Sequence, residues 1–210
     1  MKVRVITRYR YISPLLLRLI ALLTILSIFI HSLFVLKVTD YIVAYTQWGM
    51  IMSIILFALL TLIELFPDSF NGCQSFTDLL TEITFCSQFI IVVIFWLVIT
   101  IVTLIFHQER IDLTLSVVIY NFTVHTLPAL LVFLEVKNIN LSFTKTHRKF
   151  TYIPLFAYGI VAITFSNVWD ISRYPVFDFK DWKSLIFGIV CCGLNELGFL
   201  IGTKLYTNPQ

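Results

Sequence analysis

Residues Val117–Glu135 read VVIYNFTVHTLPALLVFLE, a run hydrophobic enough to lie inside a membrane, with His125 near its centre. An ionisable side chain at that depth is costly to insert, by roughly 2–3 kcal/mol for a charged group, and is therefore a candidate for function. Neutral imidazole costs less than a full charge but still needs hydrogen-bond partners. A histidine that only packs against a neighbouring helix is the alternative interpretation, because polar side chains inside membranes often serve packing.

Two neighbours of His125 bear on this choice. Asn121 lies one helical turn earlier on the same face, from where its amide can reach the imidazole and fix the tautomer that a general base requires. An interhelical amide bond is equally compatible with that position. Pro128 cannot donate to the carbonyl of Val124, so we expect the helix to be loosened beside His125. Membrane helices also tolerate such prolines without any function.

The composition of the whole chain extends this interpretation. Hydrophobic residues make up 59% of it and charged residues 13%, against about 25% charged residues in soluble domains. A helix needs about 20 apolar residues to cross a bilayer, and the apolar runs are continuous rather than alternating. The qualifying segments are Pro14–Leu36, Tyr41–Phe66, Phe85–Phe106, Leu113–Val136, Thr151–Trp169 and Leu185–Tyr206. The sequence therefore predicts an all-α polytopic membrane protein with six transmembrane helices, in which residues 1–210 form one membrane domain.

Basic residues set the expected orientation. Ten of them fall on the side of the N-terminus if the six spans are correct, and five fall on the opposite side. That excess predicts that both termini lie in the cytosol, the N-in/C-in topology. Two connections are then cytosolic: Pro67–Thr84, which has no Lys or Arg, and Lys137–Phe150, a basic strip expected to be solvated near anionic headgroups. The net charge of +3 is too small and too dispersed to indicate nucleic acid as a partner.

The chain contains no motif for a cofactor or a metal. A phosphate loop, a dinucleotide fingerprint, a Gly-x-Ser-x-Gly elbow and an HExxH pair are all absent, and the cysteines lack metal-ligand spacing. Cys73 and Cys86 flank the expected cytosolic loop, where reducing conditions disfavour a disulfide. We therefore expect neither a metal nor a cofactor, and membrane lipids as the partners.

Thr46 lies early in the second predicted span, in AYTQWGM. A threonine there is usually structural, with its hydroxyl bonded to the carbonyl one turn earlier. Topology singles it out, because the second and fourth spans both run inward from the non-cytosolic face, so that Thr46 and His125 approach from the same side. Thr46 then lies about 8 Å below its helix start and His125 about 18 Å below its own. Tilt or a later start of the fourth span has to absorb that offset of about 10 Å.

Other charged residues also fall within or near the predicted spans. Glu196 lies near the middle of the last span beside Asn195, where we expect it to be neutral or to face a polar cavity. An acid–base role, a substrate contact and a packing bond are all open for it. Arg18 is expected to snorkel to the interface. Glu64 and Glu135 are expected near cytosolic helix ends with no special role.

The run NFTVHTLP at residues 121–128, followed by Glu135, resembles the fourth-helix signature of the androgen-induced protein and androgen-dependent TFPI-regulating protein family. The third-span IFW at 94–96, and Trp169 with Tyr174-Pro175, are similar as well. The resemblance covers most of the chain, including its size and its six spans. It implies an integral membrane hydrolase of fatty acid esters of hydroxy fatty acids, with Thr46 and His125 as the essential threonine and histidine.

The chain departs from the pattern of that family in two places. Phe122 stands where the family commonly has a histidine, and DYIVAY at 40–45 stands where Gly-Gly-x-Trp-Lys usually precedes the threonine. Thr61 in the same span is an alternative nucleophile.

The resemblance implies a threonine attacking a lipid ester with His125 as its base. Candidate side chains for orienting the substrate or binding the oxyanion are Asn121, Gln47, Trp48 and Glu196. Water has to enter, so this hypothesis requires a polar cavity open toward the non-cytosolic face. The expected location is the endoplasmic reticulum membrane. The alternatives are a non-enzymatic lipid-binding or transport protein, and a scaffold whose polar residues only pack.

Overall fold

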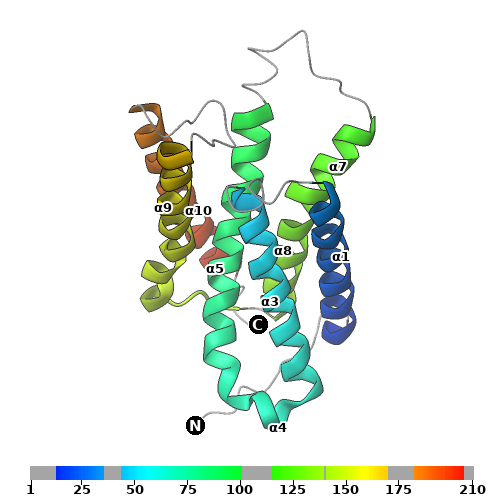
Figure 1. Cartoon of the computed structure of the whole chain (residues 1–210). Coiled ribbons are helices and arrows are strands. Elements are labelled where there is room, and N and C mark those ends of the chain that lie inside the picture. The colour runs from blue at the N-terminus through cyan, green and yellow to red at the C-terminus, as the bar shows by residue number, and fades with distance from the viewer. Residues whose placement is uncertain (1–12, 36–43, 101–114, 140, 170–181, 206–210) are drawn as a thin grey trace.

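The computed structural model describes residues 13–35, 44–100, 115–139, 141–169 and 182–205, and these residues form helices and their connections (Figure 1). The elements are α1 (Pro14–Val35), α3 (Tyr45–Leu65), α4 (Pro67–Phe70), η1 (Asn71–Cys73), α5 (Gln74–Val93), η2 (Ile94–Thr100), α7 (Leu115–His125), α8 (Leu127–Ile139), η3 (Lys145–Tyr152), α9 (Ile153–Trp169) and α10 (Trp182–Leu205). Of these, η1 and η3 are 3-10 helices and η2 is a π-helix.

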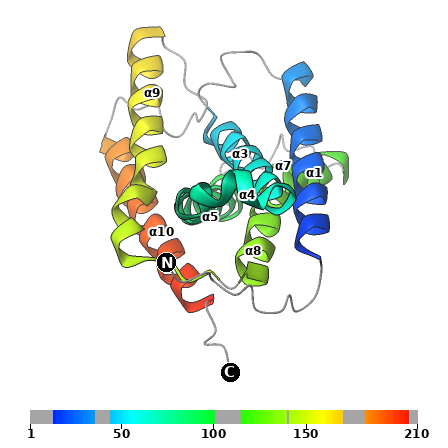
Figure 2. The same cartoon turned by 90° about the horizontal axis from the view of Figure 1, so that it is seen from below.

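Six helical stretches are long and apolar enough to cross a membrane, which confirms the predicted all-α polytopic fold. The stretch that contains α5 is the most buried of the six, with 56% of its apolar window inside the protein. Viewed along the bundle, α5 and α3 lie at the centre, and α1, α7, α8, α9 and α10 surround them (Figure 2). The third span is therefore the central helix of the bundle. The other spans expose more of their apolar side chains to lipid.

The predicted start of the third span was wrong. Instead of beginning at Phe85, the helix begins at Gln74, so most of the expected loop Pro67–Thr84 is helical. Hydropathy misses this part because it is rich in polar residues, yet four of them are buried: Thr77, Thr81, Glu82 and Thr84. The hydroxyls of Thr77 and Thr81 donate to carbonyls one turn earlier, at 2.9 Å and 2.7 Å, so the helix itself satisfies them.

The predicted loop Lys137–Phe150 was wrong in the same way. Helix α8 continues to Ile139, and η3 begins at Lys145, ahead of the predicted start of the fifth span at Thr151. Glu82 of α5 anchors the connection between them, because its Oε1 accepts the Thr144 N–H at 3.0 Å and lies 3.2 Å from the His147 Nδ1. A fully buried carboxylate thus ties the start of the fifth span to the central helix.

The fourth span is broken beside His125, as Pro128 predicts. Helix α7 ends at His125 and α8 begins at Leu127, with Thr126 as the turn residue between them. The hydrogen-bond ladder still runs across the break, since Thr126 N donates to Phe122 O and Leu130 N donates to Thr126 O, both at 2.9 Å. The break therefore changes the local helix geometry at His125 without separating the two halves of the span.

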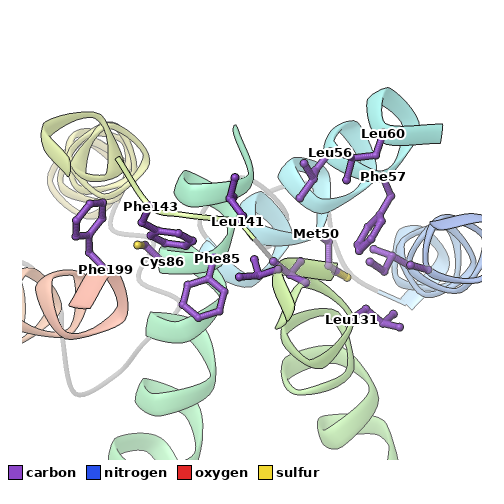
Figure 3. Close-up of a cluster of buried hydrophobic side chains, with 14 of the residues drawn as sticks. Met50, Leu56, Phe57, Leu60, Phe85, Cys86, Leu131, Leu141, Phe143 and Phe199 are labelled. Atoms are coloured by element: carbon purple, nitrogen blue, oxygen red, sulfur yellow. The ribbon is translucent and has the colours of Figure 1, made fainter. Parts of the chain in front are cut away.

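The main core joins α3, α5, α8 and α10 through the segment between α8 and η3 (Figure 3). The ring of Phe143, from that segment, lies edge-on to Phe85 of α5 and to Phe199 of α10, at 5.4 Å and 5.5 Å between centroids. It also lies directly on the backbone of Gly202, where a Cβ atom would overlap the ring. Only glycine fits this point of α10, because the aromatic ring occupies the place of a side chain.

Two glycines of α10 give a matched test of this packing. Gly202→Ala is expected to lower the free energy of unfolding by about 1–3 kcal/mol, because the core has to shift around the added methyl group. Gly193→Ala is expected to leave it unchanged or raise it by up to about 1 kcal/mol, because nothing lies within 4 Å of the added atom. Thermal unfolding of the two purified variants in one detergent measures both effects. Equal stability of the two variants would contradict this packing.

Candidate functional site

Thr46 and His125 meet in the structure, although 79 residues separate them in the sequence. The Thr46 Oγ1 lies 3.2 Å from the His125 Nδ1, a hydrogen-bond distance. The expected axial offset of about 10 Å is absorbed by α3, whose first turn lies below the upper ends of η2 and α7 (Figure 1). A helix that starts deep in the bundle brings its second residue level with the middle of the fourth span.

The position of Thr46 in the first turn of α3 has a chemical consequence. Helix α3 begins at Tyr45, after an extended Ala44 with φ −99° and ψ 112°. The first N–H groups of a helix have no carbonyl of the same helix to bond, and the helix dipole makes this end positive. Negative charge developing on the Thr46 hydroxyl, or on an atom bound beside it, is therefore favoured. Backbone donors were not predicted here, because the apolar run placed the start of this helix at Tyr41 rather than at Tyr45.

The alternative nucleophile, Thr61, has a different environment. Its Oγ1 donates to the carbonyl of Phe57 at 2.7 Å, one turn earlier in the same helix. This is the ordinary structural arrangement of a threonine in a membrane helix. Thr46 rather than Thr61 is therefore the threonine that the fold brings to His125.

The imidazole of His125 and the residue after it are contacted by η2, the segment that follows α5. The ring of Phe95 stacks on it, with 3.8 Å between centroids and 11° between planes. Trp96 donates its indole N–H to the Thr126 hydroxyl at 2.7 Å. Phe95 and Trp96 belong to η2, and π-helical turns are frequent at functional sites. The IFW motif at residues 94–96 does not by itself predict this stacking.

A small cavity of about 40 Å³ opens beside the pair. Besides Thr46 and His125, its walls come mainly from apolar side chains of α5, η2, α9 and α10, which are Ile90, Ile91, Ile94, Phe95, Leu155, Phe187 and Cys191, with Tyr45 and Tyr158. This volume exceeds the roughly 10–15 Å³ that one water needs, but it is far too small for an acyl chain. The prediction of a polar cavity was wrong, because most of the side chains that line it are apolar.

The other predicted site residues lie around the pair rather than on it. Gln47 accepts a hydrogen bond from Ser32 of α1 at 3.4 Å, so its amide carbonyl faces the neighbouring helix. Trp48 packs edge-on against Tyr158, a residue of the cavity wall, at 6.0 Å between ring centroids. Within the described helices, no hydrogen bond joins Asn121 to His125, so the expected tautomer-fixing contact is absent from this structure.

Glu196 does not belong to this site. Its Oε2 accepts a hydrogen bond from the Arg148 Nε at 2.7 Å, and its Oε1 accepts one from the Tyr152 hydroxyl. Of the two expectations for Glu196, a neutral carboxyl was wrong, because Arg148 at the start of the fifth span forms an ion pair with it. The alternative, that Glu196 faces a polar cavity, agrees with the structure, since Glu196 lines a cleft with Lys145, Arg148 and Lys149.

Arg18 is a second residue whose expected role was wrong. It is 5% exposed and so does not snorkel to the surface. Its Nε donates to the Glu135 Oε1 at 2.9 Å, and its Nη1 donates to the Glu64 Oε2 at 2.9 Å and to the Leu60 carbonyl at 3.3 Å. This ion-pair cluster therefore joins α1, α3 and α8. It lies toward the C-terminal ends of α3 and α8, whereas Thr46 lies at the start of α3 and His125 lies just before α8.

Among the described residues, no group of three or more His, Cys, Asp or Glu side chains could hold a metal ion. No protein-family model, no curated protein and no solved structure matches the chain. The assignment of a function consequently depends on the chemistry of the site.

Proposed function

We propose that this protein is an intramembrane hydrolase of lipid esters, in which Thr46 is the nucleophile and His125 the general base. The contact of 3.2 Å between Thr46 Oγ1 and His125 Nδ1 carries the proposal. A threonine hydroxyl is a weak nucleophile and needs a base within hydrogen-bond reach. The resemblance of residues 121–128 to the fourth-helix signature described above implies the same pair. It narrows the proposed substrates to fatty acid esters of hydroxy fatty acids, and the proposed location is the endoplasmic reticulum membrane.

The proposed reaction has two halves. In the first, the neutral His125 carries its proton on Nε2, and Nδ1 takes the proton of the Thr46 hydroxyl as Oγ1 attacks the ester carbonyl. The imidazolium then gives that proton to the departing alkoxide, which leaves as the hydroxy fatty acid and leaves an acyl-threonine. In the second half, His125 activates a water that attacks the acyl-threonine, and the fatty acid and free Thr46 are released.

The surroundings of the pair support this chemistry. The oxyanion of each tetrahedral intermediate needs donors. The Gln47 N–H already donates to the Ala44 carbonyl at 3.0 Å, so the proposed donors are the N–H groups of Tyr45 and Thr46 in the first turn of α3, together with the positive end of the helix dipole. The apolar cavity wall suits an acyl chain, and the cavity is large enough for water. Seating the substrate requires the lining side chains to move apart, because the closed cavity is small. A lipid ester can approach from the bilayer without crossing water.

Labelling with a fluorophosphonate probe of serine and threonine hydrolases tests this proposal. We expect the purified wild type to be labelled, Thr46→Ala to show no labelling, and His125→Ala to label at least 100-fold more slowly, since general-base catalysis contributes about 10²–10⁴-fold. Thr61→Ala is the matched control and should label like the wild type.

Folded wild type that does not react would overturn the proposal and favour a lipid-binding or transport protein. Undiminished labelling of a less stable His125→Ala variant would instead assign His125 to packing alone.

A further inference from the structure

A second site lies where the fifth span begins, away from Thr46 and His125. An open cleft of about 440 Å³ is lined by residues of η3 and by one residue of α10, which are Lys145, Thr146, Arg148, Lys149, Tyr152 and Glu196. Its lining residues are all distinct from those of the small cavity beside His125. Any ligand of this cleft is therefore recognised independently of the proposed hydrolase site.

The geometry of η3 gathers three cations around the cleft. A 3-10 helix has three residues per turn, so Lys145 and Arg148 share one face, and Thr146 and Lys149 share the adjacent one. All four of these residues are exposed. The cleft thus offers ammonium and guanidinium groups together with the Thr146 hydroxyl. A phosphate group accepts hydrogen bonds from donors of these kinds.

The single carboxylate of the cleft is already engaged. Glu196 forms an ion pair with Arg148 and accepts the Tyr152 hydroxyl, which fixes the guanidinium against α10. Because Glu196 offsets one positive charge, the cleft keeps the charge of Lys145 and Lys149. The cleft as a whole is therefore cationic and complementary to an anion.

An apolar surface continues directly from the cleft. Ile153 and Phe156, in the first turn of α9, are 56% and 60% exposed, and the Phe156 ring stacks against Tyr152 with 6.0 Å between centroids. These side chains follow η3 into the part of the span that is apolar enough to lie in the bilayer. A ligand that satisfies both surfaces has an anionic head and hydrocarbon chains.

We propose that this cleft binds the headgroup of an anionic phospholipid. Lys145, Lys149 and Thr146 bind the phosphate, Arg148 forms the wall that Glu196 holds in place, and the acyl chains lie along Ile153 and Phe156. Basic side chains at the membrane surface attract anionic lipids by roughly 1 kcal/mol each, about a fivefold gain in affinity. Two lysines in one cleft therefore give a selective site.

Native mass spectrometry of the full chain, released from detergent with added lipid, tests this inference. Phosphatidylglycerol and phosphatidylcholine are compared for the wild type, for Lys145→Gln/Lys149→Gln and for the control Lys137→Gln/Lys204→Gln. The control removes the same charge from exposed positions outside the cleft, in the last turns of α8 and α10. We expect phosphatidylglycerol to bind the wild type and the control alike, and the cleft variant roughly 10-fold or more weakly.

Three results would overturn the proposal. Equal weakening in both double variants would mean that only the overall charge matters. Equal binding of phosphatidylcholine would mean that the headgroup charge is not recognised. Displacement of phosphatidylglycerol by millimolar inorganic phosphate would assign the cleft to a free anion rather than to a lipid.

Discussion

His125→Ala is expected to lower the turnover of a lipid ester by the purified protein about 10²–10⁴-fold, the usual contribution of a general base and acid. The Thr46 hydroxyl loses the group that takes its proton during attack, and the leaving alkoxide loses its proton donor. Both halves of the reaction are slowed, so the acyl-threonine should form slowly and also hydrolyse slowly. The measurement is the rate of release of hydroxy fatty acid in detergent micelles, at equal amounts of folded protein.

His31→Ala is the matched control for this prediction. His31 lies on α1 and is exposed, and its ring lies edge-on to Tyr120 at 6.4 Å between centroids. Loss of this imidazole should change the turnover rate by no more than about twofold, since His31 is not among the residues that line the cavity. Retention of activity in His125→Ala, or an equal loss in His31→Ala, would contradict the assigned base.

Arg18→Met is expected to cause the largest loss of stability, about 3–5 kcal/mol. It removes the cation that pairs with the buried Glu135, whose Oε1 lies 2.8 Å from the Arg18 Nη2. The Glu135 side chain is 0% exposed, whereas that of Glu64 is 30% exposed and can reach water. The unpaired carboxylate of Glu135 therefore dominates the loss. Thermal unfolding in detergent measures it.

Two further variants separate the ion pair from the packing of the methylene groups. Arg18→Met/Glu135→Leu should regain most of the lost stability, because a buried pair replaced by apolar side chains of similar volume is often neutral. Glu64→Gln should cost only about 1 kcal/mol, since that carboxylate is partly solvated. If the double variant were as unstable as Arg18→Met alone, the loss would come from packing and the buried-charge account would be wrong.

Hydropathy predicted the fold because lipid accepts only long apolar helices, and every span has such a run. It failed where polar groups are buried inside the protein. Glu82, Thr77 and Thr81 lower the hydropathy before Phe85, but α5 is the central helix and needs no lipid-facing surface there. A window average does not distinguish such a segment from a solvated loop.

For the site, the sequence indicated which residues are unusual inside a membrane, but not which residues they contact. His125 stands out because imidazole is rare inside a membrane, and Pro128 predicts the break beside it. The stacking of Phe95 and the pairing of Arg18 with Glu135 depend on which faces of separate helices pack together. Residues 117 positions apart, as Arg18 and Glu135 are, leave no local pattern that one sequence could reveal.

The most direct test of the central claim, that Thr46 is a nucleophile activated by His125, is to identify the residue that carries the fluorophosphonate adduct. The labelled protein is digested, and the mass of the peptide that contains Thr46 is measured and fragmented. The account predicts one adduct, on the Oγ1 of Thr46, which disappears in Thr46→Ala and forms at least 100-fold more slowly in His125→Ala. An adduct on another residue, or unchanged labelling of a folded Thr46→Ala variant, would contradict it.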